Sequence, residues 1–168
     1  MKRDISKDLT IYLSNHYPYR SKTKSKKRYT VVLGFGGNIG HTKRLFDKIF
    51  LNFKKNSQIY IKQTSFLLKN PPFGYEKQKD FLNTVMIIKT NKTAKSMLKF
   101  CQYIEKRHHR VKLFKDAPRT IDIDIIAYKK GKNMITHHSH NLTIPHKHWK
   151  ERASVVLPLK FIKKKKHR

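Results

Sequence analysis

Residues 116–126 read DAPRTIDIDII, and this stretch decides how the rest of the chain is interpreted. Isoleucines at 121, 123 and 125 alternate with Asp122 and Asp124. An alternation with a period of two predicts a β-strand, so both carboxylates leave the strand on the same face. Two like charges that are short of water resist ionisation, and this face is therefore not ordinary core.

A divalent cation would offset the charge of the pair, and Mg²⁺ prefers carboxylate oxygens. The chain has only 10 acidic residues among 168, and two of them stand here. Arg119 precedes the pair, and a fixed guanidinium beside metal-binding carboxylates is a recurring arrangement for phosphate transfer. The motif favours this chemistry over its bland alternative, a solvent-facing strand with two idle aspartates.

Length and composition limit the remaining possibilities. With 168 residues, of which 38% are hydrophobic, the chain is expected to form one domain. Its N-terminus does not lead into a signal-peptide core, and no apolar run approaches the length of a membrane span. The single cysteine, Cys101, excludes an internal disulfide framework and fits a reducing compartment. We expect a cytoplasmic protein without a membrane partner. The sequence does not fix its oligomeric state, and a monomer is compatible with it.

The formal net charge is +30, from 40 Lys and Arg against 10 Asp and Glu. Such a surface attracts polyanions, either nucleic acid or a polyphosphate substrate. A basic nucleic-acid-binding domain is therefore one alternative function. Because the lysines are spread along the whole chain, no specific nucleic-acid partner is expected.

The hydrophobic pattern predicts one folded domain, residues 29–162, between a flexible basic N-terminal extension, residues 1–28, and a basic tail, residues 163–168. Glycines at 34–40 predict a tight strand-to-helix turn, but they match neither the dinucleotide fingerprint nor the Walker loop. The expected order β-α-β-β-α-β indicates an α+β fold, a ferredoxin-like core with an antiparallel sheet, helices packed on it and a C-terminal extension. The expected strands are 29–35, 59–68, 81–90 and 120–128, and the expected helices lie around 45–53 and at 93–109.

Four sequence blocks, in order, resemble the hydroxymethyl-dihydropterin pyrophosphokinase family. These enzymes of folate biosynthesis transfer pyrophosphate from ATP to the hydroxymethyl group of a reduced pterin and release AMP. The blocks are Leu33 to Gly40, Asn70 to Gly74 with Phe81-Leu82-Asn83, Pro118 to Asp124, and Ile144-Pro145-His146 with Arg152.

The resemblance implies ATP and a reduced pterin as substrates, and two Mg²⁺ ions held by Asp122 and Asp124. It implies catalytic roles for Arg110, Lys112, Arg119, Asp122 and Asp124. The residues implied for ATP binding are Gln102, Glu105, Arg110, Lys112, Arg119, Ile125, Thr143, His146 and Arg152. Those implied for pterin binding are Asn70, Pro71, Pro72, Phe73, Phe81 and Asn83.

The chain departs from the family pattern at several positions. Gly37 replaces a serine, Lys112 replaces an arginine, and Ser154 stands where many members place an aromatic residue against the pterin. The loop before Pro118 is one residue shorter than usual. These changes bear on ring stacking and on closure of the loop at 110–117. Another Mg-dependent nucleotidyl or glycosyl transferase that uses the D-x-D pair is a further alternative, but it leaves residues 70–74 and 81–83 without a role.

Overall fold

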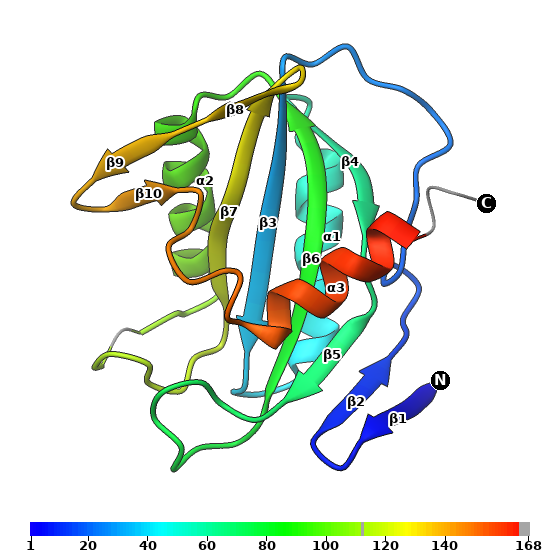
Figure 1. The fold of residues 1–168 in the computed structure, drawn as a ribbon, viewed down its shortest axis with the longest axis vertical. Coiled ribbons are helices and arrows are strands. Elements are labelled where there is room, and N and C mark those ends of the chain that lie inside the picture. Colours follow the sequence, from blue (N-terminus) through cyan, green and yellow to red (C-terminus); the bar gives the residue numbers. More distant parts are fainter. Residues whose placement is uncertain (112, 165–168) are drawn as a thin grey trace.

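The computed structural model describes residues 1–111 and 113–164 (Figure 1). Its centre is an antiparallel sheet in the order β4-β6-β3-β7. Along the chain, helix α1 (Thr42–Lys55) follows β3, and helix α2 (Ala94–Arg107) follows β6. This order confirms the ferredoxin-like α+β core. The four strands are β3 (Tyr29–Gly37), β4 (Ile59–Thr64), β6 (Phe81–Thr90) and β7 (Asp122–Lys130).

Shorter elements extend this core. Strand β5 (Leu67–Asn70) pairs with the start of β6, and β8 (Asn133–Ile135) pairs with the end of β7. Strands β9 (His137–Ser139) and β10 (Leu142–Ile144) form a separate hairpin. Within the described ranges, no helix is long and apolar enough to cross a membrane.

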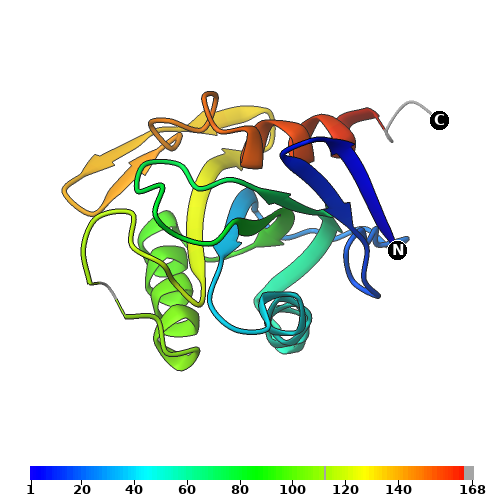
Figure 2. The ribbon, with the colours of Figure 1, turned by 90° about the horizontal axis from the view of Figure 1, so that it is seen from below.

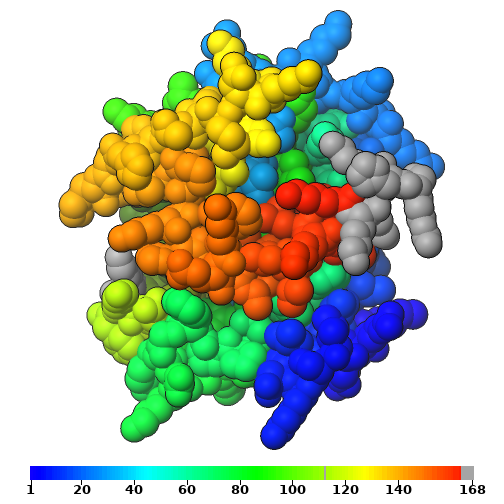
Figure 3. Space-filling model, in the orientation of Figure 1, coloured from blue at the N-terminus to red at the C-terminus, as the bar shows by residue number. Residues whose placement is uncertain are grey.

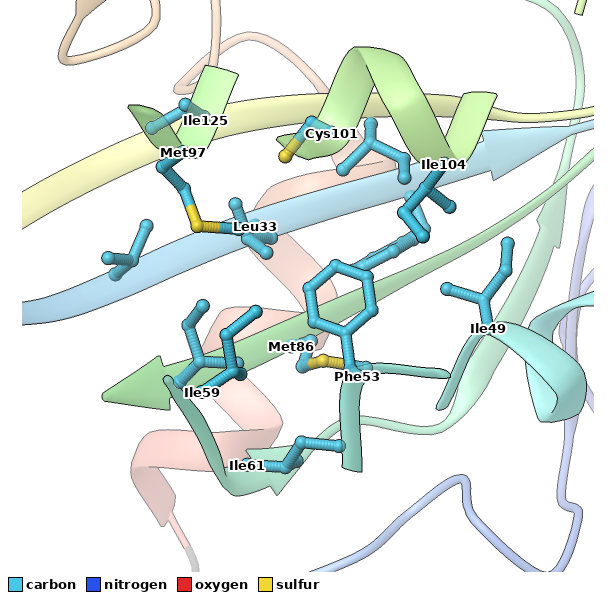
Figure 4. Packing of buried hydrophobic residues seen from close by; sticks show 14 of the residues in the cluster. Leu33, Ile49, Phe53, Ile59, Ile61, Met86, Met97, Cys101, Ile104 and Ile125 are labelled. Carbon is cyan, nitrogen blue, oxygen red and sulfur yellow. The ribbon is translucent and has the colours of Figure 1, made fainter. Parts of the chain in front are cut away.

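The sheet lies between two layers of helix. Figure 2 shows α1 and α2 on one face and α3 (Ala153–Lys164) on the other. The main core lies under α1 and α2, where Phe53 and Cys101 meet strand residues such as Leu33 and Met86 (Figure 4). Helix α1 forms there because its buried residues recur at helical spacing, which places them on one face. These residues are Phe46, Ile49, Phe50 and Phe53.

The N-terminal region joins the fold earlier than the expected boundary at Tyr29. Strands β1 (Lys2–Ser6) and β2 (Leu9–Tyr12) form a hairpin, and β2 pairs with β5 at the edge of the sheet. Further along, Tyr17 is completely buried and donates a hydrogen bond to the carbonyl of Phe46 at 3.0 Å. The N-terminal region is therefore part of the folded domain, which it joins through strand pairing and a buried side chain. The sequence pattern missed this because edge pairing uses backbone groups and leaves basic side chains in solvent.

The C-terminal segment is helical up to Lys164, whereas the sequence analysis placed a basic tail from residue 163 onward. Pro158 inside α3 concealed the helix, because proline removes one backbone hydrogen bond and disfavours a helix interior by about 3 kcal/mol. Burial offsets this cost, since Val155 and Ile162 of α3 pack with Val85 and Ile126 of the sheet in a second apolar cluster. The remaining part of the expected tail, residues 165–168, lies outside the described residues.

Candidate active site

Asp122 and Asp124 lie on the same face of β7, as the alternation predicted, while Ile121, Ile123 and Ile125 are buried. Their side chains are 18% and 34% exposed, so both carboxylates can be reached from outside. Strand β7 thus divides its residues by face: the isoleucines contribute to the core, and the two acids form the centre of the candidate site.

Glycines on the neighbouring strand β3 form the floor beside these acids. Gly36 pairs with Asp122 and Gly34 with Asp124, and on the other side of β3 Gly36 pairs with Asn83 of β6. A Cβ atom at Gly36 would lie 2.7 Å from the Asn83 Oδ1 atom. The absence of a side chain at Gly36 therefore lets the Asn83 amide lie directly against the backbone of β3, beside the two acids. The sequence analysis assigned these glycines to a turn, but β3 continues to Gly37.

Three arginines from separate parts of the chain meet the two carboxylates. The Asp122 carboxylate lies 2.9 Å from the Arg110 Nη2 atom and 3.2 Å from the Arg119 Nε atom. The Asp124 Oδ2 atom lies 3.4 Å from the Arg152 Nη1 atom. Arg110 follows α2, Arg119 precedes β7 and Arg152 precedes α3. The fold thus brings together a compact group of opposite charges whose outermost members, Arg110 and Arg152, are 42 positions apart in the sequence.

Burial and neighbouring charges set the ionisation of this group. Burial, followed by the nearby Asp122 carboxylate, raises the pKa of Asp124 to about 7, although the three arginines act in the opposite direction. His146 lies 3.9 Å from Asp124, and burial and then Arg152 lower the pKa of its imidazole. The surroundings therefore disfavour the charged form of Asp124, and a cation beside the carboxylate would offset that effect.

Glu105 occupies a different position from the other acids. It is 8% exposed, accepts a hydrogen bond from the Ile123 backbone N–H at 2.8 Å, and is ion-paired with Arg110. Burial raises the pKa of this carboxyl, and Arg110 opposes the shift. Glu105 thus ties α2 to β7 and orients Arg110. Gln102 lies on the same helix and is exposed.

Two cavities meet at the carboxylate pair. One, of about 470 Å³, is lined by residues 110–111 and 113–117 and by Asp122, Asp124 and Arg152. The other, of about 350 Å³, is lined by Ile125, Thr143 and His146, and Asp124 also borders it. The predicted ATP-binding residues on β7, β10 and the adjoining loops therefore surround one continuous region. Lys112 lies outside the described residues.

The predicted pterin residues gather on the other side of the glycine floor. The Asn83 amide donates to Asn70 Oδ1 at 2.8 Å, and Phe81 is buried beside Asn83 on β6. Phe73 is 59% exposed, and the Arg152 guanidinium lies 5.5 Å from the centre of its ring. A small hollow of about 50 Å³ is lined by Asn70, Pro71, Phe73, Phe81, Asn83, Asp116, Arg119, Arg152 and Ser154. Pro72 lies between two of these residues in the chain and is half-buried.

The sequence analysis gave no role to several residues that line or support this region. Asn38 and Gln78 connect the surrounding loops through their side-chain amides. Gly34 and Gly36 recur with the period of two that marks a strand face, and this periodicity could have identified the floor. No comparable signal in the sequence connects Gln78 with Asn38, because the two residues are 40 positions apart.

Comparison with known proteins agrees with this geometry. Residues 32–164 match the family model described as 7,8-dihydro-6-hydroxymethylpterin-pyrophosphokinase. The chain is 39% identical over 151 residues to the 2-amino-4-hydroxy-6-hydroxymethyldihydropteridine pyrophosphokinase of Helicobacter pylori. The aligned region covers 89% of the chain and 90% of the relative. It is 37% identical over 149 residues to the Campylobacter jejuni protein of the same name, covering 89% of the chain and 92% of the relative. The chain therefore belongs to the 7,8-dihydro-6-hydroxymethylpterin-pyrophosphokinase family.

Proposed function

We propose that this protein transfers pyrophosphate from ATP to the hydroxymethyl group of 6-hydroxymethyl-7,8-dihydropterin and releases AMP, a step of folate biosynthesis. The observation that carries the proposal is the pair Asp122 and Asp124, surrounded by three arginines where the cavities meet. Membership of the family favours this function over a nucleic-acid-binding domain and over another transferase with a D-x-D pair.

The carboxylate pair suits Mg²⁺. Among the residues that the structure describes, no group of three or more His, Cys, Asp or Glu side chains could hold a metal ion. The two carboxylates would therefore supply the protein ligands, with phosphate oxygens and water completing the coordination, as is usual for Mg²⁺. The raised pKa of Asp124 supports this assignment, because burial and the Asp122 carboxylate outweigh the nearby arginines and leave room for a further positive charge. When bound, two Mg²⁺ ions would neutralise charge on the triphosphate.

ATP would extend across the two cavities. Its triphosphate would lie beside Arg110, Arg119 and Arg152, where guanidinium groups can form paired hydrogen bonds with phosphate oxygens. Its adenosine would occupy the cavity lined by Ile125, Thr143 and His146. Lys112 would add charge from the loop at 110–117. Glu105 would act through Arg110, which it holds in place.

The pterin would bind over the glycine floor. Its flat ring can stack against Phe81 and Phe73, while the Asn83 and Asn70 amides can hydrogen-bond with the polar edge of the ring. Pro71 and Pro72 would stiffen the loop that carries Phe73. The Arg119 guanidinium lies over the Phe81 ring and the Arg152 guanidinium over the Phe73 ring, so both rings have a flat, charged partner.

The reaction follows from this placement. The pterin hydroxymethyl oxygen attacks the β-phosphorus of ATP in line and forms a new O–P bond. The bond between the β-phosphorus and the α,β-bridging oxygen breaks, that oxygen leaves with AMP, and the hydroxyl proton is released. The arginines stabilise the charge on the transferred group, so positioning and electrostatic stabilisation carry most of the catalysis.

The direct test is incubation of the purified protein with ATP, MgCl₂ and 6-hydroxymethyl-7,8-dihydropterin, followed by chromatography of the nucleotides. AMP that forms only when the pterin is present is the expected result. Formation of ADP, or no turnover by folded protein, would contradict the proposal. 6-Methyl-7,8-dihydropterin is the matched control, because it lacks the attacking hydroxyl group.

A further inference from the structure

Two side-chain amides outside the proposed substrate contacts connect the loops around the site. Asn38 directly follows β3, and Gln78 lies in the loop that precedes β6. The Asn38 Nδ2 atom donates a hydrogen bond to the Gln78 Oε1 atom at 2.9 Å and a second to the Lys79 carbonyl, also at 2.9 Å. Both residues are partly buried.

Asn38 holds the backbone of Arg119 on both sides. The Arg119 N–H donates to Asn38 Oδ1 at 2.9 Å, while the N–H groups of Asn38 and Ile39 donate to the Arg119 carbonyl at 2.9 and 3.2 Å. The chains approach so closely here that a Cβ atom on Gly37 would lie 2.4 Å from the Thr120 carbonyl oxygen. These contacts fix the backbone from which the Arg119 side chain reaches Asp122.

Gln78 uses its whole amide group. Its Nε2 atom donates to the carbonyls of Tyr75 and Asp116, at 2.6 and 2.9 Å, while its Oε1 atom accepts from Asn38. Backbone groups determine the orientation of both amides. Carbonyl oxygens only accept, so Gln78 Nε2 must face them, and the Arg119 N–H only donates, so Asn38 Oδ1 must face it.

The resulting chain of hydrogen bonds joins three segments, namely the turn after β3, the loop at 71–80 and the segment at 113–119. The Tyr75 and Phe114 rings pack edge to face, with centres 5.3 Å apart, and reinforce the junction. Figure 3 shows the 71–80 loop, in green, beside the yellow-green segment that follows residue 112. One segment carries the proposed pterin residues and the other carries cations of the proposed phosphate site.

We infer that Asn38 and Gln78 are positioning residues, which hold Arg119 against Asp122 and connect the pterin loop to the nucleotide loop. The inference rests on the proposed function. Neither amide lines the cavities assigned above to the substrates; each acts through the backbone of Arg119 or Asp116. Satisfied networks of this kind rigidify the groups they connect, and residues within one network have non-additive effects.

Asn38→Asp is the sharpest variant. It keeps the oxygen that accepts from the Arg119 N–H but places a second oxygen against Gln78 Oε1 and the Lys79 carbonyl, so it breaks both bonds to the loop at 71–80 and keeps the bond to Arg119. Gln78→Met removes the same connection from the other side while keeping a similar side-chain length. Asn91→Asp is the matched control, since Asn91 Oδ1 also accepts from a backbone N–H, that of Arg28 at 3.0 Å, but lies on the turn after β6.

Two measurements decide the inference. We expect Asn38→Asp and Gln78→Met each to lower kcat about tenfold with KM for ATP within about twofold, and the double variant to lower kcat by little more than either single change. Amide hydrogen exchange across 113–120 should accelerate in both variants without ligands. Asn91→Asp should change neither quantity.

A wild-type kcat together with unchanged exchange in both variants would overturn the inference, as would multiplicative effects in the double variant. The exchange measurement needs no turnover. If the wild-type protein forms no AMP, the proposed function fails, while faster exchange across 113–120 still supports the connection between the loops.

Discussion

The guanidinium of Arg119 lies over the ring of Phe81, with 4.9 Å between the Cζ atom and the ring centre. The same guanidinium contacts Asp122 through Nε at 3.2 Å. One side chain thus spans the carboxylate pair and the aromatic wall of the proposed pterin pocket. A change in the shape of Phe81 therefore affects both the stacking surface and the placement of an active-site cation.

Phe81→Leu should raise KM for the pterin about tenfold, because the ring surface for stacking is lost. Phe66→Leu is the matched control: both phenylalanines are buried, but Phe66 packs against Phe161 of α3 and lines none of the cavities described above. Steady-state kinetics with both substrates, alongside thermal unfolding, separate the effects. An equal rise in KM for the control would contradict the stacking role.

Asp122→Asn and Asp124→Asn should each abolish nearly all pterin-dependent AMP formation while leaving the fold intact, because the amide loses the charge that would hold Mg²⁺. Asp8→Asn in the turn of the N-terminal hairpin provides the control for loss of one carboxylate. Either site variant retaining activity within about tenfold, roughly 1.4 kcal/mol of barrier, would show that the metal assignment is wrong.

Stability without metal should depend on pH through Asp124. Its pKa rises on folding from 3.8 to about 7, so the folded protein binds this proton more tightly than the unfolded chain does. The stability that this proton contributes is complete below about pH 4 and is lost as the pH rises through about 7. With a chelator present to remove metal, Asp124→Asn should raise the Tm above that of the wild type. This increase should be larger at about pH 8 than at about pH 5. A difference that falls with pH would contradict the sign.

Tyr17 should anchor the N-terminal region to the domain. Tyr17→Ala should reduce the free energy of unfolding by about 3–5 kcal/mol, because the side chain is fully buried, whereas Tyr17→Phe should cost about 1 kcal/mol through the lost bond to Phe46. Urea unfolding measures both. Tyr103→Ala, at an exposed position of α2, should change the free energy of unfolding little. AMP formation below the unfolding transition should stay unchanged in all three variants, since none touches the site.

Lys112 belongs to the loop at 110–117, which we expect to close over the phosphates. Lys112→Ala should lower kcat more than it weakens ATP binding, because its charge matters most when the site is closed. Lys99→Ala, on the exposed face of α2, is the control. Hydrogen exchange across 110–117 should slow when an ATP analogue and the pterin bind together. Equal exchange with and without ligands, alongside a fully active Lys112→Ala, would exclude a closing loop.

The sequence alone determined the elements that depend on local periodicity. The alternation around Asp122 and Asp124 predicted β7 and the shared face of the two acids, and the spacing from Phe46 to Phe53 predicted α1. These patterns are legible because a strand or helix facing a core needs apolar residues at its own period. The four sequence blocks also indicated the family.

Only the tertiary structure decided which residues meet. The guanidinium groups of Arg110 and Arg119 reach the same carboxylate because β7 returns past the end of α2, and Asn38 reaches Gln78 because two loops lie side by side. The N-terminal hairpin was missed because it joins the sheet through backbone hydrogen bonds, which leave no side-chain pattern. Helix α3 was missed because the local cost of Pro158 is offset by burial against strands distant in the sequence.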